Sequence, residues 1–432
     1  MIHNYFIWAT FYARLNLLWI GATMGDYSIR SKFFIITTLA CLASAGMSYA
    51  DADRDAVSPS VQLGALETQP VQAINQPNLI SQDTFDVFVP KKQTLSTSFD
   101  YTVWDNALEN RVIQMGPSLR RFAKRTRQPL GSRVVISSRN SPYRLEGSRF
   151  TFNYISDSYV ASLNAYKDDL IRLANEYDIQ SFSRNEQLAF WINLHNVVLI
   201  EAIAQKHPTT NPSDLIFGQD MLPLHEAKLM TIKDVPLSLR NIRENIVYEN
   251  WNTPNVIYGF FRGDIGGPGL MPFAVTAENL EYVLATHALE YITSLRGFHT
   301  TKKYRKISQL YNEARPYYFS NWPQDLESHL KGYLQNHELL SQVQENKPIS
   351  FIEYETIIAD LWGGNNSLGS AHVTNWRLDK RGGLVRSGLM AWTPPVLIER
   401  KKKIKELGAK GLLKRNYTII IEELETEDKT VP

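Results

Sequence analysis

Residues 186–198 read EQLAFWINLHNVV, and this stretch decides the centre of the fold. On a helix, its apolar side chains cover two faces. One face holds Leu188, Ile192 and Leu199 together with His195, and the other holds Phe190, Trp191, Leu194 and Val198. Ser183, three residues before Glu186, is typical of a capping box. The pattern predicts a buried helix that ends at Lys206-His207-Pro208, because the residue before a proline avoids the helical region.

Three polar residues interrupt this apolar helix and form a stripe: Glu186, Asn193 and Asn196. Buried polar groups without partners are costly, so the two amides must find hydrogen bonds. The simpler interpretation is a structural network in which Asn193 and Asn196 hold neighbouring loop backbone. The functional interpretation places His195 or the asparagine pair at the rim of a cleft. A lone histidine facing leucines is more often a core residue than a catalytic one.

Other helical patterns predict that helices dominate the chain. The first starts near Tyr101 and places Trp104, Leu108, Val112 and Met115 on one face. Further helices are predicted over 158–177, 239–251, 277–295 and 324–340. Strand candidates are few: 85–89, 134–137, 256–261 and 417–422. We therefore predict an α+β fold, a mostly helical globule with a small β-sheet.

The N-terminus resembles a targeting segment rather than part of the fold. Arg30 and Lys32 precede an apolar stretch over 33–47, and Ser48-Tyr49-Ala50 has the small-residue pattern of a cleavage site. This predicts a signal peptide over 24–50, cleaved near Ala50, and a periplasmic or secreted protein. The apolar stretch is shorter than the roughly 20 residues of a membrane span, so we expect no stable span in the mature form.

Residues 1–23 lie upstream of that signal, which favours Met24 as the true start of translation; a membrane anchor over 5–23 is the alternative. Residues 1–50 hold three of the 46 basic and one of the 44 acidic residues, so the rest of the chain is neutral overall. This balance argues against nucleic-acid binding. The single cysteine, Cys41, lies in the signal, so the mature chain has no disulfide or thiolate chemistry.

Composition marks both flanks of the remaining chain. Residues 51–95 are rich in Gln, Pro, Ser and Asn and predict a flexible linker. Near the C-terminus, residues 399–405 and 410–415 form a basic cluster, for which a solvated helix face and contact with anionic lipid or cell-wall polymer are both open.

Complete catalytic or metal motifs are absent from the sequence. His225-Glu226 lacks the second histidine of a His-Glu-x-x-His zinc motif, and Ser367 and Ser370 miss the spacing of a nucleophile elbow. We therefore predict no metal and no cofactor. His225 stays a candidate ligand-binding residue on its residue type alone.

Residues 185–196, NEQLAFWINLHN, resemble the hallmark helix of a family known only as domain of unknown function 547. Residues 230–246, MTIKDVPLSLRNIRENI, resemble the family's second signature, and the resemblance extends over about 96–354. It implies a globular domain over 96–354, followed by a C-terminal extension over 355–432. It implies a bacterial protein of a kind often exported and carries no settled activity.

Residues 259–273, GFFRGDIGGPGLMPF, form a glycine-rich loop that fits neither a Walker loop nor a dinucleotide fingerprint. Members of the resembled family typically have a histidine-bearing strand and then a loop with cysteines. Here Ile257 stands at the histidine position, and Arg262 and Gly267 stand at the cysteine positions. If the family residues form a thiol–histidine site, this chain has lost both members.

Two functions remain open. The first is a noncatalytic binding or scaffold protein of the bacterial cell envelope, in which Arg262 binds a small anionic or peptide-like ligand. In the second, a periplasmic hydrolase or transferase acts on a small or cell-wall-derived substrate through His195, His225, Arg262 or Asp264. Convergence of His195, Arg262 and Asp264 on one pocket would favour the enzyme. A third arrangement, in which Arg262 and Asp264 simply pair with each other, would favour neither.

Overall fold

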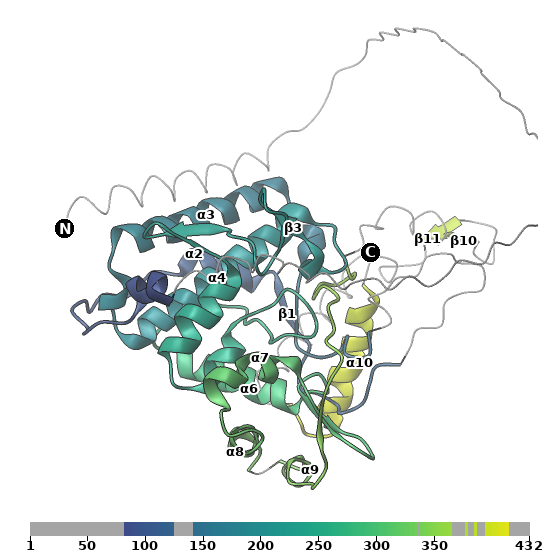
Figure 1. Cartoon of the computed structure of the whole chain (residues 1–432). Helices are drawn as coiled ribbons and strands as arrows, with labels where there is room; N and C mark the ends of the chain where they lie inside the picture. Colours follow the sequence, from purple (N-terminus) through teal and green to yellow (C-terminus); the bar gives the residue numbers. More distant parts are fainter. Residues whose placement is uncertain are drawn as a thin grey trace, which may run out of the picture. The chain divides into compact units, whose positions relative to one another are not determined.

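The computed structural model describes residues 82–124, 141–335, 337–364, 376–378, 384–386 and 394–413 (Figure 1). Helices dominate these residues, and the strands form small sheets of two or three members. This confirms the predicted α+β class.

The central helix α4 spans Arg184–Lys206. Ser183 caps it, since its Oγ accepts a hydrogen bond from the Glu186 amide at 3.2 Å. The second half of the expected capping box is absent, because the Glu186 carboxylate accepts from the Phe99 amide instead, at 2.7 Å. Every residue from Glu186 to Ile203 is buried. Among the described helices α4 alone is long and apolar enough to cross a membrane, and its apolar stretch lies wholly inside the fold.

Helix α3, Asp157–Glu176, packs against α4 and agrees with the prediction for 158–177. Helix α2, Thr102–Glu109, is shorter than its pattern predicted. Trp104 and Leu108 are buried on it as expected, but Val112 belongs to a strand that pairs with Phe150. The helical prediction was wrong past Glu109, because a second element competes for the backbone of residues 112–114.

The remaining helices follow in chain order: α5 Leu239–Asn241, α6 Leu280–Thr293, α7 Gln309–Tyr318, α8 Gln324–Leu334, α9 Leu340–Val343 and α10 Pro395–Ala409. Short 3₁₀ turns are η1 Gln82–Phe88, η3 Phe152–Tyr154, η4 Ile179–Ser181, η5 Pro212–Asp214 and η7 Pro254–Gly259. Helix α5 continues directly into a π-helix, η6, over Ile242–Tyr248. Thr276 and Asn279 bond each other's amides before α6, at 2.9 and 3.2 Å.

All the described sheets are small. The strands are β1 Val112–Gln114, β2 Ser148–Phe150, β3 Ile216–Phe217, β4 Leu222–Pro223, β5 Met230–Ile232, β6 Val235–Leu237, β7 Phe298–Thr300, β8 Arg305–Ile307, β9 Ile349–Phe351, β10 Trp376–Leu378 and β11 Leu384–Arg386. Pairs form antiparallel ribbons, except that β9 adds in parallel to β8.

Two strand predictions were wrong. Residues 85–89 lie in and just after the turn η1, and the run 256–261 begins inside η7. Pro254 at the first position of η7 has a backbone angle suited to a helical turn. A short apolar run indicates only that its side chains are buried. The side chains of a turn can be buried as well as those of a strand. The candidates at 134–137 and 417–422 lie outside the described residues.

The packed domain extends beyond the predicted limits of 96 and 354. Phe88 is 1% exposed, and its ring meets that of Trp191 edge-on at 5.5 Å. On the other flank, Ile358 and Ala359 are buried, and Ala359 donates to the Gly263 carbonyl at 2.9 Å. Both flanking segments therefore contribute to the same core as α4.

Helix α10 carries residues 399–405 of the basic cluster, and its two faces differ. Arg400 and Lys403 are buried; Arg400 donates to the Gln114 carbonyl, and Lys403 to the Gly116 carbonyl at 3.0 Å. Lys401, Lys402 and Lys405 are exposed. The cluster therefore combines an inward face that anchors α10 with an outward face in solvent.

Candidate functional site

The two asparagines of α4 hold the backbone of neighbouring loops. Asn193 donates to the Val275 carbonyl at 2.6 Å and accepts from the Val275 amide at 3.1 Å. Asn196 donates to the Gly259 carbonyl and accepts from the Phe261 amide, both at 3.1 Å. These are the contacts expected if the polar stripe of α4 positions the glycine-rich loop.

His195 is fully buried between Asn196 and Arg243. Its Nε2 lies 3.1 Å from Arg243 Nη1, and its Nδ1 lies 3.0 Å from Asn196 Oδ1. An arginine can only donate, so Nε2 accepts and the ring proton sits on Nδ1, from which it is donated to Asn196. Burial and then the charge of Arg243 lower the pKa of His195 well below its ordinary value. His195 is therefore a neutral hydrogen-bond acceptor toward Arg243.

Arg243 comes from the π-helix η6 and is 1% exposed. Besides His195, its Nη1 lies 3.5 Å from Nδ1 of His225, and its Nε lies 3.4 Å from Oε1 of Glu313. His225 is half-buried, and burial followed by the charges of Arg243 and Arg262 lowers its pKa well below the ordinary value. A π-helical turn is rare and is often found at functional sites.

Arg262 points inward to the same carboxylate. Its Nη2 donates to Oε1 of Glu313 at 2.5 Å, and its side chain is 8% exposed. Burial alone would raise the pKa of Glu313, but the charges of Arg262 and Arg243 hold it down at about 2. Glu313 is therefore ionised and serves as counter-ion to two arginines.

Asp264 has different partners, although it is only two residues away. Its Oδ1 accepts from the Gly267 amide and from the Tyr354 hydroxyl, both at 2.9 Å. Burial raises the pKa of Asp264 to about 7, in spite of these hydrogen bonds and of Arg262. Within the described residues Arg262 pairs with Glu313, so the arrangement in which Arg262 and Asp264 simply pair with each other was wrong.

The glycines of the loop are required by close packing. Gly263 has a φ of +82°, and a Cβ there would overlap the Ile203 side chain. A Cβ on Gly266 would lie 2.8 Å from the Glu355 carbonyl oxygen, and one on Gly267 would lie 2.7 Å from Arg262. The Gly266 amide already donates to that Glu355 oxygen at 2.9 Å. The loop backbone is therefore engaged with the chain itself and does not form an open phosphate cradle.

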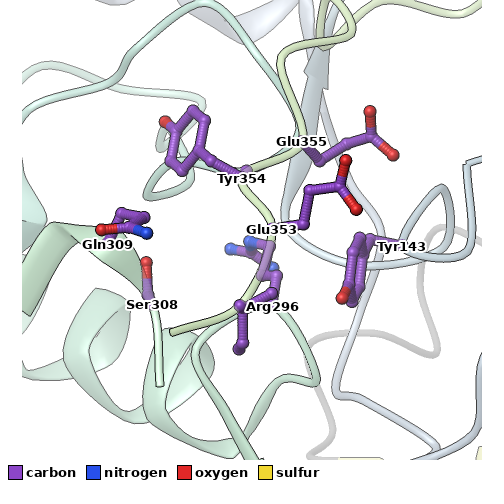
Figure 2. A pocket seen from close by; sticks show the side chains of 9 residues that line it. Tyr143, Arg296, Ser308, Gln309, Glu353, Tyr354 and Glu355 are labelled. Carbon is purple, nitrogen blue, oxygen red and sulfur yellow. The ribbon is translucent and has the colours of Figure 1, made fainter. Parts of the chain in front are cut away.

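A small pocket has Gly266 of the loop in its lining (Figure 2). It has room for about one water molecule, at a volume of about 10 Å³. Arg296 lies between Ser308 and Gln309 on one side and Tyr143 on the other. The lining consists of Tyr143, Gly266, Arg296, Ser308, Gln309, Ile352, Glu353, Tyr354 and Glu355. None of the predicted site residues belongs to this lining.

The six predicted residues thus divide into three places. His195, His225 and Arg262 lie in one charged cluster, Asn196 connects that cluster to the loop, and Asp264 and Asn193 lie apart with other partners. Sequence reasoning missed Arg243 and Glu313, which complete the cluster. Arg243 lies within the signature 230–246, whereas Glu313 lies on α7 and nothing in its local sequence marked it.

The described residues contain no group of three His, Cys, Asp or Glu side chains placed to hold a metal ion. The cluster around Arg243 consists instead of two arginines, two neutral histidines and one carboxylate. Such a set suits the binding of an anion better than the binding of a cation.

Helix α4, η6 and the glycine-rich loop lie in one segment, residues 179–292, that matches a protein-family model. The family is described as protein of unknown function, DUF547. The match confirms the resemblance predicted from the sequence. No curated protein and no solved structure matches the chain. Arg243 and Arg262 lie inside the DUF547 segment, whereas their counter-ion Glu313 lies beyond it.

Proposed function

We propose that the chain is a noncatalytic binding or scaffold protein of the bacterial cell envelope. One observation carries the proposal. Arg262, which by the resemblance stands at a cysteine position of the family, is buried in an ion pair with Glu313. The histidine position is taken by Ile257, which is fully buried. If the family residues form a thiol–histidine pair, a salt bridge and an apolar side chain stand in its place here.

The state of the candidate acid–base groups supports the same conclusion. A general base needs a free lone pair within reach of a substrate proton. Both ring nitrogens of His195 are engaged inside the fold, and the Asn196 amide is held by loop backbone. The groups of the cluster that can still form hydrogen bonds are donors, which favours ligand binding over catalysis.

The setting of the protein is proposed from its sequence. The signal-like segment 24–50 supports export to the periplasm or beyond, with a mature form that starts near Asp51 and has no stable membrane span. The balanced charge of the mature chain favours a small anionic or peptide-like ligand over nucleic acid.

A periplasmic hydrolase or transferase is the second candidate, and Asp264 is the observation that favours it. Its pKa of about 7, raised by burial, lies where a general acid or base works best at neutral pH. Its partner Tyr354 lines the pocket beside Gly266. That pocket has room for only about one water molecule, so a substrate would need the surrounding segments to open.

Cell fractionation together with a turnover screen tests the proposal. We expect the full chain, expressed in a bacterium, to be recovered from the envelope or periplasm with an N-terminus at Asp51. We expect no turnover of ester, peptide, glycoside or cell-wall substrates. Activity that is present in the wild type and lost in Asp264→Asn would contradict the noncatalytic assignment. Recovery of a chain that still contains residues 33–47 would contradict the cleaved signal.

A further inference from the structure

The charged cluster holds two buried arginines and one carboxylate. Arg243 Nε and Arg262 Nη2 both contact Oε1 of Glu313, at 3.4 and 2.5 Å. The arginine side chains are 1% and 8% exposed, whereas that of Glu313 is 26% exposed. Arginine remains protonated in proteins, so a single negative charge is shared between two positive ones.

Few neighbours of the cluster offer the two arginines a further hydrogen-bond acceptor. His195 and His225 are neutral acceptors toward Arg243. The charge of Glu244, also from η6, acts on Arg243 and Arg262, but its ion pair is with Arg240, at 3.5 Å. Burial and then the charge of Arg262 lower the pKa of Arg243, whereas the charge of Glu313 raises that of Arg262 in spite of its burial. Within the described residues Glu313 is therefore the carboxylate that forms ion pairs with both arginines.

The cluster is also short of hydrogen-bond acceptors. The Nε–H of Arg262 and the hydroxyl of Tyr248 are buried, and neither has a partner among the described residues. Tyr248 is 2% exposed and closes the same π-helix that carries Arg243. Buried donors without acceptors are costly, and in native proteins they commonly indicate a missing water or ligand. The oxygen of a bound carboxylate would supply such an acceptor.

We propose that Arg243 and Arg262 form a binding site for a small carboxylate, and that Glu313 occupies this site as an internal counter-ion while no ligand is bound. The inference rests on the proposed function, in which the chain binds its ligand without transforming it. Two guanidinium groups can donate to both oxygens of a carboxylate.

Glu313 can leave the site because it lies at the surface end of the cluster. Glu313 comes from α7, outside the DUF547 segment. Among Arg243, Arg262 and Glu313, it has the most exposed side chain. Rotation of this side chain into solvent would free the donors of both arginines. The simpler alternative is a structural ion-pair network, in which Glu313 never exchanges with a ligand.

Thermal unfolding in sodium acetate, with sodium chloride at equal ionic strength as reference, separates the two. In Glu313→Gln the side chain that competes with acetate for the two arginines loses its charge. We therefore expect the apparent affinity for acetate to rise about tenfold over the wild type. We expect the effect to disappear in the double variant Glu313→Gln with Arg262→Met. An acetate response in Glu313→Gln no larger than in the wild type would overturn the proposal.

Glu327→Gln is the matched control. Glu327 pairs with Arg305 at 2.6 Å, with side-chain exposures of 23% and 11%. Arg305 also donates through Nε to the Lys347 carbonyl and through Nη1 to the Val343 carbonyl, both at 2.8 Å, and neither residue of the pair has a buried polar atom without a partner among the described residues. We expect no acetate-specific stabilisation in this variant. An equal acetate response in both variants would also overturn the proposal.

The wild type provides a second test, in which the response of the unaltered protein to acetate is measured. The ¹⁵N-labelled side-chain Nε–H resonance of Arg262, assigned by comparison with Arg262→Lys, is expected to shift in a saturable way with acetate and not with chloride. No shift over the acetate range, or a response to inorganic phosphate alone, would overturn the carboxylate site. Neither result bears on fractionation or turnover, so this site and the proposed function can fail separately.

Discussion

Trp191→Ala is expected to lower the free energy of unfolding by about 3–5 kcal/mol, the range for large aromatic residues truncated inside a packed core. Trp191 is 1% exposed at the centre of α4. Its ring lies 5.5 Å from that of Phe88 and 5.4 Å from that of Phe190, both edge-on. The substitution removes both ring contacts and leaves a cavity where η1 meets α4. Urea denaturation followed by fluorescence or circular dichroism measures the loss.

Tyr282→Ala is the control for this measurement, because Tyr282 is 62% exposed on α6. We expect that variant to stay within about 0.5 kcal/mol of the wild type. A loss below about 1 kcal/mol for Trp191→Ala would show that α4 is peripheral and that the core is elsewhere.

Asn196→Ala is expected to cost about 3 kcal/mol, because it leaves three buried groups without partners. The Phe261 amide loses its acceptor, the Gly259 carbonyl loses its donor, and His195 Nδ1 loses its acceptor. The first two losses release the start of the glycine-rich loop, and the third releases the histidine that faces Arg243. Native-state hydrogen exchange should therefore show faster exchange of the Phe261 amide in the variant.

Asn185→Ala provides the matched control on the same helix, since Asn185 is exposed in the first turn of α4. We expect almost no change in stability or in exchange at Phe261. If Asn196→Ala were as mild as Asn185→Ala, the loop would be held by other contacts and the role assigned to Asn196 would be wrong.

The central helix could be predicted because the residues that determine it lie close together in the sequence. The capping residue Ser183, the apolar faces and the stop at His207-Pro208 all lie within about one helix length. The same period indicated that Asn193 and Asn196 would be buried polar residues in need of partners. It could not name Val275 or Gly259 as those partners, because contacts 82 and 63 residues away depend on the tertiary fold.

The charged cluster could be predicted only in part for the same reason. Arg262 could be singled out because it lies among the glycines of the loop. Glu313 lies 51 residues further along the chain, in a sequence typical of an amphipathic surface helix, so nothing marked it as the partner of Arg262. The run 256–261 was misread as a strand because an apolar run reports burial and not backbone shape. The glycines invited a phosphate loop, and only the structure shows that Ile203, Glu355 and Arg262 fill the space beside them.

The central claim is that the cluster around Arg243 binds rather than reacts, because its histidines are neutral acceptors held inside the fold. Long-range ¹H–¹⁵N NMR of the imidazole nitrogens tests this directly, across about pH 5 to pH 8, where a free histidine changes charge. We predict that His195 stays neutral throughout, with its proton on Nδ1, and that His225 also does not titrate in this range. Burial and the adjacent arginines lower the pKa of both. A His195 that titrates near pH 7, or that carries its proton on Nε2, would contradict the account.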